Sequence, residues 1–210
     1  MRFGGAAAAR TAATLLAVAV GAATAQPARA DFTPCASCHG EGGVSYNADT
    51  PSLAGQPSFY AITQLFLFRA GRRSNASMTE VAKPMSDADL RAYSELIGRL
   101  TAAPSPRDVP ADPERMARGA ALAEQHRCTS CHGADLAGGK QVPRLAGQRE
   151  DYLARALAEF RSGARVGYTS AMNDTVAGIG AAELGDLAHY MAHVPATPAN
   201  VGAAASSVPR

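Results

Sequence analysis

The sequence contains four cysteines, which form two pairs with the same local sequence. Each pair has two residues between its cysteines and a histidine directly after the second one: Cys35, Cys38 and His39, then Cys128, Cys131 and His132. Two thiols three residues apart can each form a thioether with one vinyl group of the same porphyrin, and the adjacent imidazole can then reach the iron. C-x-x-C-H is the attachment sequence for c-type haem. The chain is therefore predicted to hold two covalently bound haem c groups.

The similarity between the two halves extends beyond these motifs. P-x-L-A-G-Q occurs at residues 51–56 and again at 143–148, and Tyr60 and Tyr152 each follow the glutamine by four residues. F-R-x-G occurs at 68–71 and 160–163, and the copies stay 92 to 94 residues apart throughout. An internal repeat of this kind predicts two versions of one haem-binding unit. We call residues 31–105 the first repeat and residues 106–195 the second repeat.

Prolines separate the two repeats, at Pro104, Pro106, Pro110 and Pro113. They interrupt helices and favour an extended linker, so we place the domain boundary near Pro106.

Residues 1–30 are expected to be a signal peptide, because two arginines precede a short apolar stretch and an A-x-A pattern at 28–30. Residues 196–210 show no periodic apolar face and are expected to form a disordered tail.

The charge of the chain excludes some classes of function. The net charge is +2, and removal of residues 1–30 takes away three arginines and no acid, which leaves −1. A balance so close to zero provides no field for nucleic-acid binding. The apolar stretch of the leader is shorter than the ~20 residues of a membrane-spanning helix, and no later segment is long enough. We therefore expect a periplasmic protein with no integral membrane span after signal cleavage.

Each iron needs a second axial ligand, and methionine sulfur is the usual partner of histidine in electron-carrying cytochromes. Met78 and Met172 occupy equivalent positions, since each lies 12 residues before a leucine of the next expected helix. Met85 is a rival in the first repeat, but its counterpart in the second repeat is Ile179, which cannot bind iron. Met78 and Met172 are therefore the predicted ligands opposite the two histidines.

Apolar residues at helical spacing predict helices throughout, with no convincing strands. Two helices follow the P-x-L-A-G-Q motifs and end near Gly71 and Gly163, and the last helices are expected at 86–100 and 181–194. A further helix should begin at Asp112 and Pro113 and lead to the second cysteine pair. The first repeat has no room for such a helix before Cys35. Its last helix is therefore expected to rest on the other repeat or on another protein.

Taken together, C-x-x-C-H-G, P-x-L-A-G-Q with its tyrosine, F-R-x-G and an isolated methionine resemble class I cytochrome c. Two such units behind a signal peptide resemble the dihaem cytochrome c4 family, over almost the whole mature chain. The resemblance implies an all-α fold of two tandem small class I cytochrome c domains, each wrapped around one covalent haem, and periplasmic electron transfer. It also implies that the carbonyl groups of Pro51 and Pro143 accept hydrogen bonds from the ligand histidines.

The expected function is to carry single electrons between a redox protein donor and an acceptor, such as a dehydrogenase, a membrane cytochrome complex or a terminal oxidase. No catalytic residue is predicted. A close alternative is an electron-transfer subunit of a periplasmic dehydrogenase or oxidase complex. A dihaem peroxidase-like enzyme would need one iron with an open position, which the equivalent methionines disfavour. A zinc or disulfide protein uses the same cysteines, but pairs about 90 residues apart, each followed by histidine, fit it badly.

Two further groups of residues are candidate sites. His189 and His193 lie four residues apart on the last expected helix and could bind a metal on one face. No third ligand is evident in the sequence, so a structural role is favoured. Arg72 and Arg165 follow the glycines of F-R-x-G and could pair with haem propionates, although solvated charge at a helix end explains them equally well.

Overall fold

The computed structural model describes residues 1, 31–107, 109–167 and 169–196. In these ranges the chain forms α-helices and one short 3-10 helix (Glu41–Gly43), and an isolated bridge between Gly139 and Val142 is the whole of its β structure. The predicted all-α class is confirmed. Residues 2–30 of the predicted signal peptide and residues 197–210 of the predicted tail lie outside the described residues. None of the helices described here has both the length and the apolar character needed to cross a membrane.

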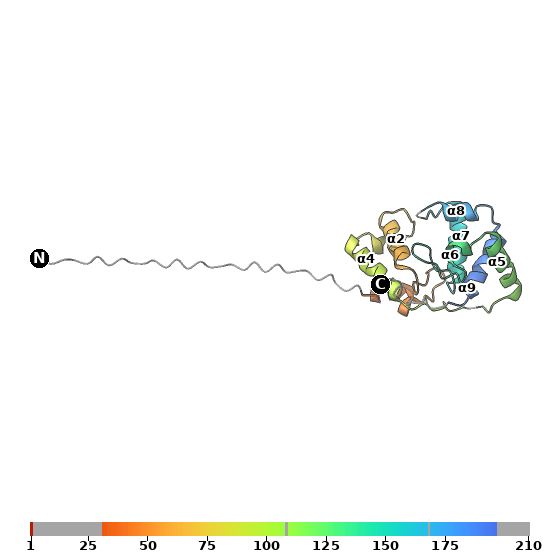
Figure 1. The fold of residues 1–210 in the computed structure, drawn as a ribbon, viewed down its shortest axis with the longest axis horizontal. Helices are drawn as coiled ribbons and strands as arrows, with labels where there is room; N and C mark the ends of the chain where they lie inside the picture. The colour runs from red at the N-terminus through yellow and green to blue at the C-terminus, as the bar shows by residue number, and fades with distance from the viewer. Residues whose placement is uncertain (2–30, 108, 168, 197–210) are drawn as a thin grey trace, which may run out of the picture.

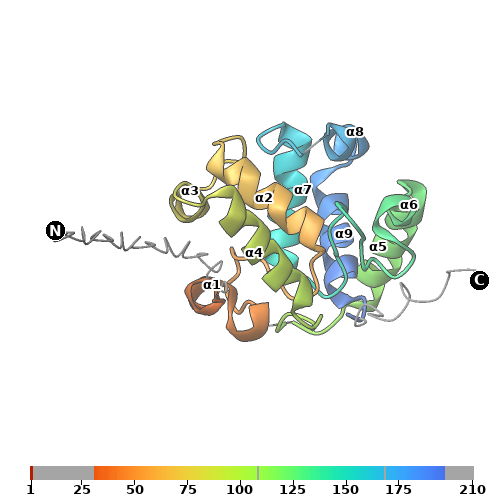
Figure 2. The same cartoon turned by 60° about the vertical axis from the view of Figure 1, so that its left-hand side comes forward.

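The two repeats lie at opposite ends of the described structure, as the colours of Figures 1 and 2 show. The first repeat contains α1 (Thr33–His39), α2 (Ser58–Arg69), α3 (Ala76–Ala82) and α4 (Asp87–Arg99). The second repeat contains α5 (Pro113–Gln125), α6 (Thr129–His132), α7 (Glu150–Ser162), α8 (Ala171–Val176) and α9 (Ala181–His193). Helices α1 to α4 correspond in order to α6 to α9, and α5 is the additional early helix of the second repeat.

Local sequence signals explain where these helices begin and end. At the start of α4 the N–H of Asp89 donates to the Ser86 hydroxyl (3.2 Å), and the N–H of Ser86 donates to the Asp89 carboxylate (2.9 Å), which is a complete capping box. The Asp112 carboxylate accepts hydrogen bonds from two backbone N–H groups in the first turn of α5. Pro113 has no N–H group that would need a partner there. Gly163 ends α7 in the left-handed conformation. The predicted helices are confirmed to within a few residues.

The core of the second repeat lies where α9 packs against both α5 and α7. Leu184, Leu187 and Met191 of α9 are almost completely buried there. Helix α5 approaches closely because it carries Gly119 at the crossing: a Cβ at this position would lie 2.4 Å from the carbonyl oxygen of Asp186. The last helix of this repeat is therefore enclosed from two sides.

The last helix of the first repeat, α4, packs extensively against one of the described helices, whereas α9 packs against two. Helix α4 packs against α2 and buries Leu90 and Ile97 (Figure 2). Among the described helices, none besides α2 contacts α4 to the extent that α5 contacts α9, and Glu95 and Arg99 on α4 are about two-thirds exposed. Helix α2 is the counterpart of α7, so it does not replace the α5 contact, and none of the described helices of the second repeat packs against α4 to a comparable extent. Contact of α4 with another protein stays a prediction.

The described part of the segment between the repeats lies against the second repeat. Residues 101–107 have no regular secondary structure, and Ala102 and Ser105 are buried. The N–H of Ser105 donates to the carbonyl oxygen of Gly147 at 2.7 Å. The linker therefore packs against the P-x-L-A-G-Q turn of the second repeat.

Candidate haem sites

The two C-x-x-C-H motifs adopt the same local structure. Each motif ends a short helix, α1 or α6, at a histidine followed by a glycine with positive φ, 78° at Gly40 and 83° at Gly133. The first cysteine of each pair is half-buried and the second is exposed, and all four cysteines are free thiols. Burial raises the pKa of the thiols of Cys35 and Cys128, which keeps them protonated at neutral pH.

Both motif histidines are buried and oriented by a proline carbonyl. The Nδ1–H of His39 donates to the carbonyl oxygen of Pro51 at 2.8 Å, and that of His132 donates to Pro143 at 2.9 Å. Burial lowers the pKa of both imidazoles, which favours the neutral form. A neutral imidazole that donates through Nδ1 keeps the lone pair of Nε2 for a metal. These residues therefore fit a haem attached through the neighbouring cysteines.

The candidate methionines lie on the short helices that precede the last helix of each repeat. Met78 is half-buried on α3, and its N–H donates to the Asn75 side chain that caps this helix (2.9 Å). Met172 is half-buried on α8 and packs against the core of the second repeat. The rival Met85 is also half-buried, but it follows α3 in a turn. The equivalence of Met78 and Met172 thus extends from sequence to secondary structure, and their binding of iron stays a prediction.

A cluster of two tyrosines and two arginines lies between the repeats. Arg73 Nη2 donates to the Tyr152 hydroxyl at 3.1 Å, and Arg165 donates to Tyr60 at 3.2 Å and to Tyr152 at 3.3 Å. Each arginine also stacks on the phenylalanine of its own F-R-x-G motif. Burial raises the pKa of Tyr60, whereas at Tyr152 the charges of Arg165 and Arg73 outweigh burial and lower the pKa.

Arg73, rather than Arg72, corresponds to Arg165 in the structure, and pairing of these arginines with haem propionates stays a prediction. Arg72 is exposed, whereas Arg73 is the residue that mirrors Arg165 in this cluster. The signal was present in the sequence, because Arg73 and Arg165 are 92 residues apart, as are the F-R-x-G motifs that precede them.

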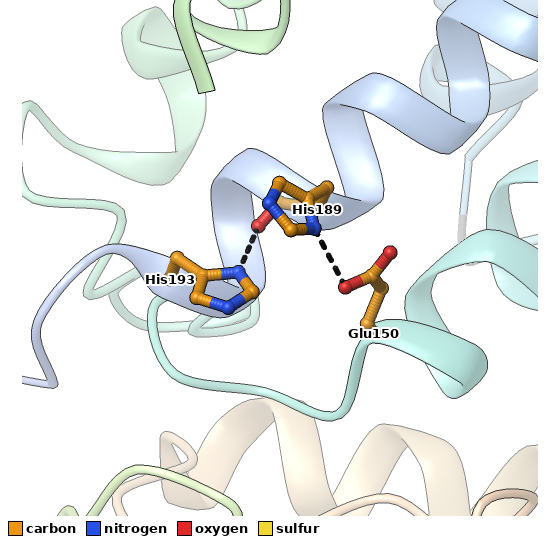
Figure 3. A group of neighbouring side chains, drawn as sticks. All are labelled: Glu150, His189 and His193. Atoms are coloured by element: carbon orange, nitrogen blue, oxygen red, sulfur yellow. Dashed lines mark hydrogen bonds and ion pairs between the residues drawn. The ribbon is translucent and has the colours of Figure 1, made fainter. Parts of the chain in front are cut away.

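The structure adds a third member to the predicted histidine pair. Ligand atoms of Glu150, His189 and His193 lie within 4.8 Å of one another (Figure 3). The Nδ1–H of His189 donates to the Glu150 carboxylate at 2.8 Å, and its Nε2 accepts the N–H of Asp112 at 2.9 Å. Both ring nitrogens of His189 are therefore used within the protein, and His193 Nδ1–H donates to the His189 carbonyl (2.8 Å). The favoured structural role agrees with this geometry.

Comparison with known proteins identifies the family. The cytochrome c family model matches residues 116–195. Cytochrome c4 of Pseudomonas aeruginosa is 31% identical over 185 residues, which cover 85% of this chain and 91% of that protein. The chain belongs to the cytochrome c4 family. The crystal structure of reduced recombinant cytochrome c4 from Pseudomonas stutzeri superposes with a TM-score of 0.69, with 28% identity over 78% of this chain and 94% of that one.

A second kind of relative carries a more specific name. The thiosulfate dehydrogenase electron acceptor of Thiomonas intermedia is 35% identical over 151 residues, which cover 68% of this chain and 70% of that protein. The resemblance read from the motifs is thus confirmed. As a c4-type cytochrome, the chain is a dihaem electron-transfer protein that carries covalently bound haem c.

Proposed function

We propose that this chain carries single electrons in the periplasm through two irons, each held between a histidine and a methionine. His39 and Met78 would bind one iron, and His132 and Met172 the other. One observation carries the proposal: in both repeats the motif histidine is buried and donates Nδ1–H to a proline carbonyl. This arrangement fixes the ring and presents Nε2 as a ligand.

The bound haem supplies an iron that exchanges one electron between its ferric and ferrous states. The chain contributes the environment of that iron. A methionine sulfur raises the reduction potential of a haem iron and closes the position where a small ligand could bind. The half-buried setting of Met78 and Met172 on α3 and α8 suits this role. Two closed irons favour a carrier over a peroxidase-like enzyme.

The organisation of the chain is part of the proposal. Residues 1–30 would be removed as a signal peptide, which places the mature protein in the periplasm. Residues 31–105 and 106–195 would form the two cytochrome domains. The opposite placement of the two sets of helices is consistent with this division (Figure 1).

Redox proteins are the proposed partners, with a dehydrogenase on the donor side and a membrane cytochrome complex or a terminal oxidase on the acceptor side. One observation favours a second candidate role, as the electron-accepting subunit of a periplasmic dehydrogenase: the relative from Thiomonas intermedia is named as the electron acceptor of thiosulfate dehydrogenase. A thiosulfate dehydrogenase that reduces this protein in stopped-flow mixing, and co-elutes with it, would support this role. Rapid reduction without co-elution would support the free carrier.

Three methionine variants of the haem-loaded chain test the ligand assignment. The weak near-infrared-edge absorption band that reports methionine bonded to ferric iron should fall by half in Met78→Ala and in Met172→Ala, and each variant should bind carbon monoxide at one iron. Met85→Ala is the matched control and should leave the band intact. Loss of the band in Met85→Ala, or carbon monoxide binding by the unaltered protein, would overturn the assignment. The second result would favour an enzyme.

A further inference from the structure

The glutamines of the two P-x-L-A-G-Q motifs reach across the boundary between the repeats. Gln148 accepts the N–H of Ser52 on Oε1 (2.8 Å) and donates Nε2–H to the Ser52 carbonyl (2.9 Å). Gln56 accepts the N–H of Arg144 (3.1 Å) and donates to the Arg144 carbonyl (2.9 Å). All four residues are at most 6% exposed. Each glutamine therefore satisfies one buried backbone position of the other repeat.

These reciprocal hydrogen bonds, which we call the glutamine exchange, relate the two repeats by an approximate two-fold symmetry. Ser52 and Arg144 are both the second residue of the motif, and Gln56 and Gln148 are both the last. The glycine before each glutamine has a positive φ, 71° at Gly55 and 68° at Gly147, so both turns have the same shape. The orientation of each amide is fixed, because a backbone N–H requires the oxygen and a backbone carbonyl requires the NH₂ group.

These bonds end on the peptide groups that orient the motif histidines. The N–H of Ser52 and the carbonyl of Pro51 belong to one peptide group, and that carbonyl accepts the Nδ1–H of His39 at 2.8 Å. The N–H of Arg144 and the carbonyl of Pro143 also share a peptide group, which accepts from His132 at 2.9 Å. A continuous chain of two hydrogen bonds therefore links each glutamine to the histidine of the other repeat.

Hydrogen bonds in such a chain reinforce one another. When the amide oxygen of glutamine accepts the peptide N–H, the peptide becomes more polarised and its carbonyl oxygen becomes a better acceptor. A better acceptor draws the Nδ1 proton of the imidazole more strongly and makes Nε2 a stronger donor to a metal. The effect is larger in a buried site, where water does not compete for the same groups.

We propose that Gln148 is a positioning residue for His39 and that Gln56 is a positioning residue for His132, so that each repeat tunes the iron centre of the other. This inference rests on the proposed function, in which these histidines bind iron. A histidine that donates more strongly stabilises ferric iron. Removal of a glutamine amide should therefore raise the reduction potential of the haem in the opposite repeat.

The test compares Gln148→Met with Gln56→Met in the full haem-loaded chain. Methionine is close to glutamine in length and offers no strong hydrogen bond. The resonances of the two haems are followed separately by NMR during a redox titration. Gln148→Met should raise the potential of the first-repeat haem more than that of the second, and Gln56→Met should do the reverse. Ser105→Ala is the control, because Ser105 binds the Ser52 hydroxyl and not this peptide group (2.7 Å).

A shift in the potential of the haem in the opposite repeat, which we call a crossed shift, distinguishes an effect on the ligand histidine from a general structural effect. Equal shifts of both haems, a shift of the haem in the same repeat as the substitution, or no shift would overturn the inference. If Gln148→Met does not fold, Gln148→Asn keeps an amide but shortens its reach, and the crossed shift should persist. If the unaltered protein shows the methionine-to-iron band but the glutamine variants show no crossed shifts, this inference alone is overturned. Absence of this band in the unaltered protein would overturn the proposed function.

Discussion

The two repeats hold the same attachment geometry in unequal surroundings. The distances from histidine to proline carbonyl differ by 0.1 Å between the repeats, 2.8 and 2.9 Å. By contrast, α9 is covered by α5 and α7, whereas α4 has one helix partner of comparable extent. The early helix is therefore not needed to orient the motif histidine. Its contribution is to enclose the last helix.

Charged groups strengthen the same contrast. Arg115 of α5 binds Glu150 (2.9 Å) and Asp186 (3.3 Å), and Arg118 binds Asp186 at 2.6 Å. The position of α4 that corresponds to Asp186 is Ala92, which has no charge to offer. Ionic contacts thus tie α5, α7 and α9 together in the second repeat. The first repeat should depend more heavily on its haem for stability.

Removal of one haem at a time gives the largest expected effect. Cys35→Ser with Cys38→Ser, and separately Cys128→Ser with Cys131→Ser, should each reduce covalent haem from two per chain to one. The first pair should cost more helix, because α4 then has little beyond α2 to pack against. Pyridine haemochrome content and far-ultraviolet circular dichroism are the measurements. Equal loss of helix in both double variants would contradict the asymmetry.

A side chain at the α5 and α9 crossing should have the next largest effect. Gly119→Val places a Cβ 2.4 Å from the Asp186 carbonyl oxygen and 2.5 Å from Tyr190 Cβ, so the helices must separate. Overpacking of this kind costs about 3 kcal/mol of unfolding free energy. Gly178→Ala, where nothing lies within 4 Å, is the control and should change little. Denaturant unfolding measures both, and a neutral Gly119→Val would mean that the helices do not meet closely.

His189 and Glu95 occupy equivalent positions on α9 and α4. His189→Leu would leave the N–H of Asp112 and the carboxylate of Glu150 without this partner, at a cost of roughly 1–3 kcal/mol. Glu95→Leu on the exposed face of α4 should leave the unfolding free energy nearly unchanged. A matched pair of chemical denaturation curves tests this. A similar loss in both variants would show that α4 is as enclosed as α9.

The smallest effect is expected for Asp186→Asn, and it should depend on pH. Hydrogen bonds from Arg118 lower the pKa of the Asp186 carboxyl in the folded state, compared with about 3.9 in an unfolded chain. Its stabilisation, of the order of 1 kcal/mol, is therefore present above the unfolded pKa and is lost as the pH falls through the folded pKa.

Unfolding at pH 7 and at pH 3 measures this difference. The variant should be less stable than the parent protein at pH 7, and the difference in their unfolding free energies should be smaller at pH 3. The matched control is Asp87→Asn in the first repeat, where the carboxylate that binds Arg69 is 72% exposed and should contribute less. A difference that does not change with pH would contradict the role of ionised Asp186.

Local signals predicted much of this fold. The capping residues Ser86 and Asp112 and the apolar spacing of α2, α4, α7 and α9 were sufficient to place the helices, because these features act within a few residues of sequence. The additional helix α5 was also expected from Asp112 and Pro113. The cysteine and histidine positions followed from the repeated motif.

Contacts between distant residues could not be predicted in the same way. The repeat showed that Gln56 and Gln148 are equivalent, but equivalence does not reveal that each meets the other copy of the motif. Glu150 joins His189 across 39 residues, and no local pattern signals this contact.

The glutamine exchange also bears on how such a chain can arise. A surface that offers a glutamine and accepts the same glutamine from its copy is self-complementary, which is the requirement for a two-fold homodimer. Because the partners at positions 52 and 144 are backbone atoms, Ser52 and Arg144 could diverge without loss of the contact. Fusion through residues 101–112 turns an association that depends on concentration into an intramolecular one. The two halves can then acquire different surfaces while they remain paired.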